Sequence, residues 1–225
     1  MSFERFENSR KATLVLADGT VFEGKAFGAE GGVIGETVFT TAMTGYQETL
    51  TDPSYCGQIV TQTFPLIGNY GVNKIDPESN GSAVSGYIVR ECCDAPSNFR
   101  CEGDLDSYLK SLNIVGICDI DTRRLTRIIR ESGVMNGAIV SGEFDKDKLL
   151  EDIRAYRVGG VVPKVSVKKK EYYPAENAKH NVVLMDYGYK FNIRRELVKR
   201  GCNVTVMPYN AAADEIKALS PDGIM

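Results

Sequence analysis

A change of composition between Gly159 and Lys179 constrains the fold of this 225-residue chain more than any other feature. It separates two parts whose apolar residues follow different patterns. The segment holds two glycines, two prolines and three consecutive lysines, without sustained apolar periodicity. Such a composition is typical of a linker. We therefore predict a loose, disordered lead-in over residues 1–10, a domain over 11–158, a linker over 159–179 and the start of a second domain over 180–225.

The part before the linker has the pattern of a β-rich unit. Asp18-Gly19 lies between two apolar runs and predicts a hairpin over 13–27, because this pair supplies the positive φ of a tight turn. Apolar runs predict further strands near 36–42, 58–64, 83–90, 114–118 and 135–141. Apolar residues spaced by three and four behind acidic or threonine caps predict helices near 105–112, 122–133 and 145–156. The first domain is therefore expected to be a mixed α/β fold with helices packed on a sheet.

The part after the linker alternates strand and helix. Continuous apolar strands are expected near 181–186 and 204–207, and helices near 192–200 and 212–219. Such alternation is typical of a parallel sheet covered on both faces. Two strands fall short of the usual ~5 to 6 of a sheet, and Ile224-Met225 has the pattern of a third strand just beginning. We therefore expect the sequence to stop inside an open parallel α/β domain.

Residues 41–55 are dense in hydroxyl and amide side chains between two strand-like runs, which predicts a polar loop on a rigid scaffold. Gly45 permits a left-handed backbone, and Asp52-Pro53 predicts a tight turn that presents Ser54 and Tyr55. The alternative is an ordinary surface turn with Tyr46 in the core.

Residues 44–48, Thr-Gly-Tyr-Gln-Glu, and residues 50–55, Leu-Thr-Asp-Pro-Ser-Tyr, resemble the glutamine-hydrolysing small subunit of carbamoyl phosphate synthetase. The run Asp-Ile-Asp-Thr-Arg-Arg-Leu-Thr-Arg over residues 119–127 resembles a signature of the same family, and residues 65–69 and 95–99 fit between the two. The resemblance covers nearly all of the chain but only part of the family's subunit. It implies that residues 180–225 begin a class I glutamine amidotransferase domain.

The resemblance also implies a function. In the family, a cysteine with a later histidine and an acidic residue hydrolyses glutamine, and the ammonia passes to a large subunit that makes carbamoyl phosphate from bicarbonate with ATP and a divalent metal. The serine of Asp-Pro-Ser-Tyr, here Ser54, binds part of the L-glutamine in family members. The family's Gly-x-Cys-Leu-Gly-x-Gln elbow and its histidine segment do not occur here. We therefore expect an inactive fragment with no catalytic residue and no cofactor of its own, which contacts the large subunit through its first domain.

Two other readings of the chain stay open. The first is a free-standing, non-catalytic binding or scaffold protein that reuses the association domain. The second is a thiol hydrolase that uses Cys56, the best placed of the six cysteines, although the sole histidine, His180, lies at the linker boundary. Hydrolysis of an amide that is lost in Cys56→Ala would distinguish the thiol hydrolase from the scaffold.

Charge and composition exclude several classes. The net charge of −3 indicates neither a nucleic-acid nor a membrane partner. The sequence contains no phosphate-binding glycine loop. It also lacks the Cys-x-x-Cys pair that would indicate a metal site. No apolar stretch approaches the ~20 residues of a membrane span, and residues 1–7 lack the apolar core of a signal peptide, so we expect a cytoplasmic protein. Arg123, Arg124, Arg127 and Arg130 cluster on one expected helix, as a solvated face or a protein contact.

Overall fold

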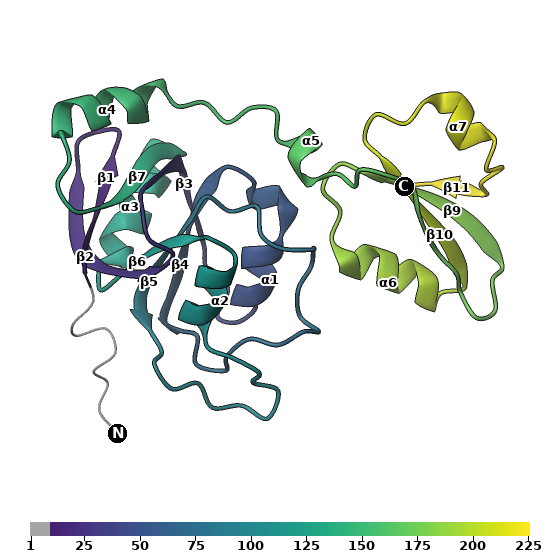
Figure 1. Ribbon diagram of the computed structural model, residues 1–225, viewed down its shortest axis with the longest axis horizontal. Helices are drawn as coiled ribbons and strands as arrows, with labels where there is room; N and C mark the ends of the chain where they lie inside the picture. The colour runs from purple at the N-terminus through teal and green to yellow at the C-terminus, as the bar shows by residue number, and fades with distance from the viewer. Residues whose placement is uncertain (1–9) are drawn as a thin grey trace.

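The structure, a computed structural model, describes residues 10–225 and consists of a closed β-barrel followed by a smaller sheet (Figure 1). The predicted lead-in over residues 1–10 lies, except for Arg10, outside the described residues. No helix within residues 10–225 is long and apolar enough to cross a membrane.

Seven strands close the barrel in the order β1-β2-β6-β5-β4-β3-β7, with β7 paired to β1. Their bounds are β1 Lys11–Leu16, β2 Val21–Gly28, β3 Val33–Thr40, β4 Gln58–Ile67, β5 Gly86–Cys92, β6 Val115–Cys118 and β7 Met135–Ser141. The pairs β3–β4, β4–β5 and β5–β6 are parallel, and the other four pairs are antiparallel. The mixed α/β class was predicted, whereas closure of the sheet into a barrel was not.

An apolar cluster fills the barrel and receives side chains from all seven strands and from helix α3, Thr122–Ser132. Leu125 and Ile129, one turn apart on α3, are buried in this cluster. The helix has an acidic cap, as predicted: the carboxylate of Asp121 accepts a hydrogen bond from the backbone N–H of Arg124 at 2.9 Å. It ends at Gly133, whose φ of 78° suits a glycine.

Further helices cover the outside of the barrel. They are α1 Tyr46–Thr51, α2 Leu105–Ser111 and α4 Lys146–Ala155, with a short 3-10 turn, η1, over Pro53–Tyr55. Because side chains alternate along a strand, Ile88 of β5 joins the barrel interior while its neighbours Tyr87 and Val89 pack outside, in the cluster that α1 and α2 cover. Ile153 of α4 packs on a separate outer patch.

The second sheet has the order β11-β9-β10-β8, in which β9 His180–Asp186 pairs in parallel with β10 Cys202–Pro208 and with β11 Gly223–Ile224. Helices α6 Phe191–Lys199 and α7 Ala213–Lys217 connect these strands. The predicted linker also contains helix α5 Val162–Val165 and strand β8 Glu171–Tyr173, which pairs antiparallel with β10. A strand of three residues is too short to show a period in the sequence, so it was not predicted.

Gly24 in β2 offers a test of the closed barrel. A Cβ atom at Gly24 would lie 2.3 Å from the backbone oxygen of Cys118 and 2.6 Å from the Ile120 side chain. We expect Gly24→Ala to destabilise the protein by about 1 to 3 kcal/mol, because one of the atoms that the new Cβ would overlap belongs to the backbone and cannot easily move. Gly159→Ala is the matched control, since a Cβ there meets nothing within 4 Å. Equal unfolding midpoints in chemical denaturation for the two variants would contradict this packing.

Candidate functional site

The polar segment of residues 41–55 is partly helical, which corrects the prediction of a loop. Tyr46 and Leu50, one turn apart on α1, are fully buried, and the hydroxyls of Thr49 and Thr51 donate to backbone carbonyls one turn earlier. The six-residue helix escaped prediction because only two apolar residues mark its buried face. The alternative placement of Tyr46 in the core is confirmed.

Two side chains of α1 fix it to residues 70–73. The Tyr46 ring stacks on that of Tyr70, with centroids 4.2 Å apart, and its hydroxyl donates to the carbonyl of Gly71. The buried Gln47 amide donates to the carbonyl of Asn73 at 2.7 Å and accepts from its N–H at 2.9 Å. The segment is therefore rigid, as a scaffold for a binding turn needs to be.

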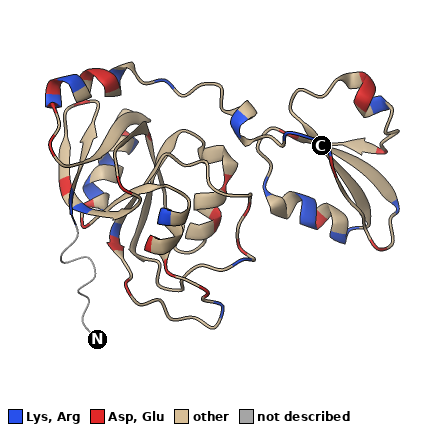
Figure 2. Cartoon of the chain, in the orientation of Figure 1, with Lys and Arg blue, Asp and Glu red and all other residues tan. Residues whose placement is uncertain are grey.

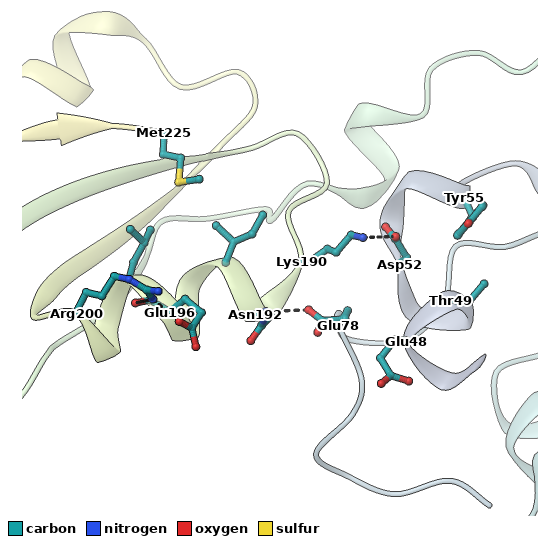
Figure 3. A pocket seen from close by; sticks show the side chains of 12 residues that line it. Glu48, Thr49, Asp52, Tyr55, Glu78, Lys190, Asn192, Glu196, Arg200 and Met225 are labelled. Atoms are coloured by element: carbon teal, nitrogen blue, oxygen red, sulfur yellow. Dashed lines mark hydrogen bonds and ion pairs between the residues drawn. The ribbon is translucent and has the colours of Figure 1, made fainter. Parts of the chain in front are cut away.

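The turn after α1 is organised by Asp52. Its Oδ1 accepts from the backbone N–H of Ser54 at 3.0 Å and from the Ser54 hydroxyl at 2.6 Å. Its Oδ2 lies 2.7 Å from Nζ of Lys190, at the start of α6. One carboxylate therefore holds the predicted turn and joins it to the second unit of the fold (Figure 3).

The electrostatics of this pair favour both charged forms. Burial by itself raises the pKa of Asp52, but the hydrogen bonds from Lys190 and Ser54 together outweigh it and hold the pKa below its ordinary value. The pKa of Lys190 is raised, chiefly by its hydrogen bond to Asp52. The ion pair therefore persists through the neutral range of pH.

Glu78 makes a second connection between the two units. Its backbone carbonyl accepts from the N–H of Phe191 at 2.8 Å, and its carboxylate accepts from the N–H of Asn192 at 2.8 Å. These N–H groups belong to the first turn of α6. The N–H groups of a first turn have no hydrogen-bond partner within the helix, and this end of a helix favours a nearby negative charge. The N–H of Glu78 in turn donates to the hydroxyl of Thr51 at 2.9 Å, so Glu78 connects α1 to α6.

The loop after β9 faces the same turn. Asp186 at the end of β9 accepts from the N–H groups of Gly188 and Tyr189 at 2.8 and 3.0 Å, which fixes the loop. Gly188 has a φ of 103°, and a Cβ there would lie 3.3 Å from the Pro53 side chain. Ligands of open α/β sheets bind at the carboxyl ends of parallel strands, and this end of β9 lies against the Asp52 turn.

A cavity of about 590 Å³ lies between the two units (Figure 3). Its lining includes four acidic and two basic side chains: Glu48, Asp52, Glu78, Glu196, Lys190 and Arg200. Burial raises the pKa of Glu48, and Oε2 of this carboxylate has no hydrogen-bond partner among the described residues. A cavity of this size and mixed charge can accept a small zwitterion.

The structure places the predicted site residue Ser54 on the exposed side of the Asp52 turn. Ser54 is not among the residues that line the 590 Å³ cavity, whereas its neighbours Asp52 and Tyr55 are. Both of its donors, the N–H and the hydroxyl, bind Asp52. Within residues 10–225, the hydroxyl oxygen of Ser54 accepts no hydrogen bond.

The other predicted candidates have less to support them. Burial raises the pKa of the Cys56 thiol although Lys164 opposes this, so the thiolate, which is the nucleophilic form, is scarcer at neutral pH. His180 begins β9, is exposed, and lies 4.0 Å from Asp222. Neither residue lines the cavity between the units.

Sequence reasoning missed Glu78 and the pairing of Lys190 with Asp52. Each meets its partner across more than 110 positions of sequence, and no local pattern distinguishes them from other surface charges. The only available signal was the position of Lys190 in the loop after the first parallel strand, where ligands of such sheets bind.

Comparison with known families matches both units. Residues 14–139 match the CPSase domain of the carbamoyl-phosphate synthase small chain. Residues 183–225 match the class-I glutamine amidotransferase family. The first match covers more than half of the chain.

Comparison with curated proteins gives similar relatives. The carbamoyl phosphate synthase small chain of Bacillus thuringiensis subsp. konkukian is 54% identical over 215 residues, 96% of this chain and 58% of the relative. The small chain of Clostridium perfringens is 50% identical, over 94% of this chain and 60% of the relative. A pyrimidine-specific small chain of Halalkalibacterium halodurans is 48% identical, over 96% and 59%. The chain therefore spans less than two thirds of the length of these relatives.

The ion pair between Asp52 and Lys190 predicts a pH-dependent stability. Because the folded-state pKa of Asp52 is depressed, its contribution is present above the ordinary value of 3.8 and disappears as the pH falls through the lower folded value. We expect Asp52→Asn to cost about 1 kcal/mol at pH 7, limited by the half-exposed lysine, and progressively less toward pH 3. The measurement is chemical denaturation at several pH values.

Asp18→Asn is the control for this experiment. Asp18 also holds a tight turn through the N–H and hydroxyl of a residue two positions later, Thr20, but no lysine is paired with it. A cost of Asp52→Asn that does not change between pH 7 and pH 3 would contradict the role given to the ion pair.

Proposed function

The chain belongs to the carbamoyl-phosphate synthase small-chain family, and on that premise we propose that it forms part of a cytoplasmic subunit that releases ammonia from L-glutamine. The ammonia serves a large chain, which makes carbamoyl phosphate from bicarbonate with ATP and a divalent metal. In this proposal the barrel unit contacts the large chain, and residues 180–225 contribute the first strands of the amidotransferase domain.

The observation that carries the proposal is the carboxylate of Asp52, which orients Ser54 and pairs with Lys190. The glutamine-binding serine implied by the Asp-Pro-Ser-Tyr motif thus lies where the barrel meets the part that matches amidotransferases. A site built across two units uses both to enclose a small ligand.

The hydrogen bonding at Ser54 suggests which end of glutamine it binds. Because the Ser54 hydroxyl already donates to Asp52, its oxygen is available as an acceptor. The α-ammonium group of glutamine has three donors and the α-carboxylate has none. We therefore assign the ammonium end of the substrate to Ser54, and the nearby carboxylate of Asp52 adds a favourable charge.

The chemical step is assigned to residues outside this sequence. In the family's reaction a thiolate attacks the side-chain amide of glutamine, ammonia leaves, and water releases glutamate from the thioester. We propose that the nucleophile, its histidine base and the acidic residue belong to the part of the relatives that this chain does not span. Residues 1–225 alone are then inactive, and their contribution is to bind substrate and partner.

Ser54→Ala tests the proposal in the full natural chain that contains this sequence, assayed with its large chain. We expect the KM for glutamine to rise about 5- to 30-fold, the equivalent of about 1 to 2 kcal/mol for one hydrogen bond to a charged group. The kcat should change less than about threefold, because the lost interaction is present in the ground state as well as the transition state.

Ser111→Ala is the matched control. Its hydroxyl is exposed and, within residues 10–225, donates only to the carbonyl of Tyr108 on α2, so the variant should retain the wild-type KM. If Ser54→Ala hydrolyses glutamine with an unchanged KM, Ser54 does not bind the substrate.

A further inference from the structure

Helix α3 carries three arginines on one exposed face. Arg123, Arg127 and Arg130 follow one another at spacings of four and three residues, which places them on the same side of the helix. The opposite side buries Leu125 and Ile129 in the barrel. The arginines therefore belong to an element that the barrel core holds rigidly. Figure 2 colours their positions on the ribbon blue.

These arginines line a surface cavity together with hydroxyl groups. The cavity has a volume of about 360 Å³, and its other lining residues are Thr41, after β3, Thr63 of β4, and Thr126 of α3 itself. The three guanidinium groups and the hydroxyls of Thr41 and Thr63 offer hydrogen-bond donors. The Thr126 hydroxyl already donates to the carbonyl of Thr122 at 2.7 Å. A planar guanidinium binds carboxylates through two parallel hydrogen bonds, so such a surface suits an acidic partner.

The charge of this face is not matched by the described part of the chain. No ion pair or hydrogen bond joins the side chains of Arg123, Arg127 or Arg130 to any residue among 10–225, although the chain has a net charge of −3. Arg124, by contrast, lies over the Phe22 ring at 5.2 Å from its centroid.

An exposed apolar side chain follows one of the cavity-lining residues closely in the sequence. Met43, two residues after Thr41, is 70% exposed. The backbone between them is fixed, because the carbonyl of Ala42 accepts from the Gln62 amide at 2.7 Å. Arginine and methionine are both enriched in protein interfaces relative to the rest of a protein surface.

We propose that this arginine face of α3, defined as Arg123, Arg127 and Arg130 with Thr41 and Thr63, is the surface on which an acidic patch of the large chain docks. The inference rests on the proposed function, since it names the place and chemistry of the contact with the large chain. Figure 1 shows α3 farther from the second sheet than α1, the helix that precedes the Ser54 turn. In this proposal a large chain bound to α3 leaves the Ser54 turn accessible to glutamine.

The test measures binding of the full natural chain to its large chain, at low and at physiological ionic strength. The variant Arg127→Glu/Arg130→Glu reverses two charges of the face. The control variant Lys146→Glu/Lys148→Glu makes the same charge change on exposed positions of α4, where neither lysine has an ion pair within residues 10–225. Thermal unfolding of each variant verifies that it is folded.

We expect the arginine variant to bind the large chain at least about tenfold more weakly at low salt, with a shallower salt dependence, because opposite charges at an interface steer association. The lysine variant should bind within about twofold of the wild type. A folded arginine variant that binds as tightly as the wild type overturns the inference and leaves the proposed function intact. If the wild type itself fails to bind the large chain, the proposed partner is wrong and the inference falls with it.

Discussion

The hydrogen bonds of one carboxylate determine how the two units of this protein meet. Asp52 holds the turn that carries Ser54 with one oxygen and pairs with Lys190 with the other. An aspartate that only capped a turn would leave its second oxygen to water. Here that oxygen pairs with Lys190, 138 positions later in the sequence. The contact raises the pKa of the lysine. The position of the turn relative to the parallel strands follows from this pair and from Glu78, which caps α6.

The barrel gives this turn its rigidity. Side chains from seven strands and from α3 fill the interior, while α1 and α2 cover one outer patch. Because α1 is buried through Tyr46 and Leu50 and is fastened through Gln47, the Asp52 turn at its end has little freedom. Preorganisation of this kind lowers the entropic cost of binding a small ligand. Under the proposed function, the scaffold therefore contributes to the affinity for glutamine without touching it.

Local signals in the sequence predicted the helices and strands with strong apolar periodicity. The remaining features of the fold depend on pairing between residues far apart in the sequence. Helix α3 was predicted from Leu125, Ile128 and Ile129 and from its Asp121 cap, because these signals act within one or two turns. Closure of the barrel depends on β7 returning to β1, a pairing that no local pattern encodes. Of the candidate site, the Asp-Pro turn and Ser54 were predicted from residues and resemblance. Lys190 was not, since its role exists only after the chain has folded.

The central claim is that Ser54 binds the ammonium end of glutamine where the barrel meets the amidotransferase unit. A crystal structure of the full natural chain with bound L-glutamine tests it most directly. The account predicts the α-amino nitrogen at about 3 Å from the Ser54 oxygen, with the pair between Asp52 and Lys190 intact. Glutamine bound in the same crystal without a contact to the Asp52 turn, or bound through its carboxylate to Ser54, would contradict it.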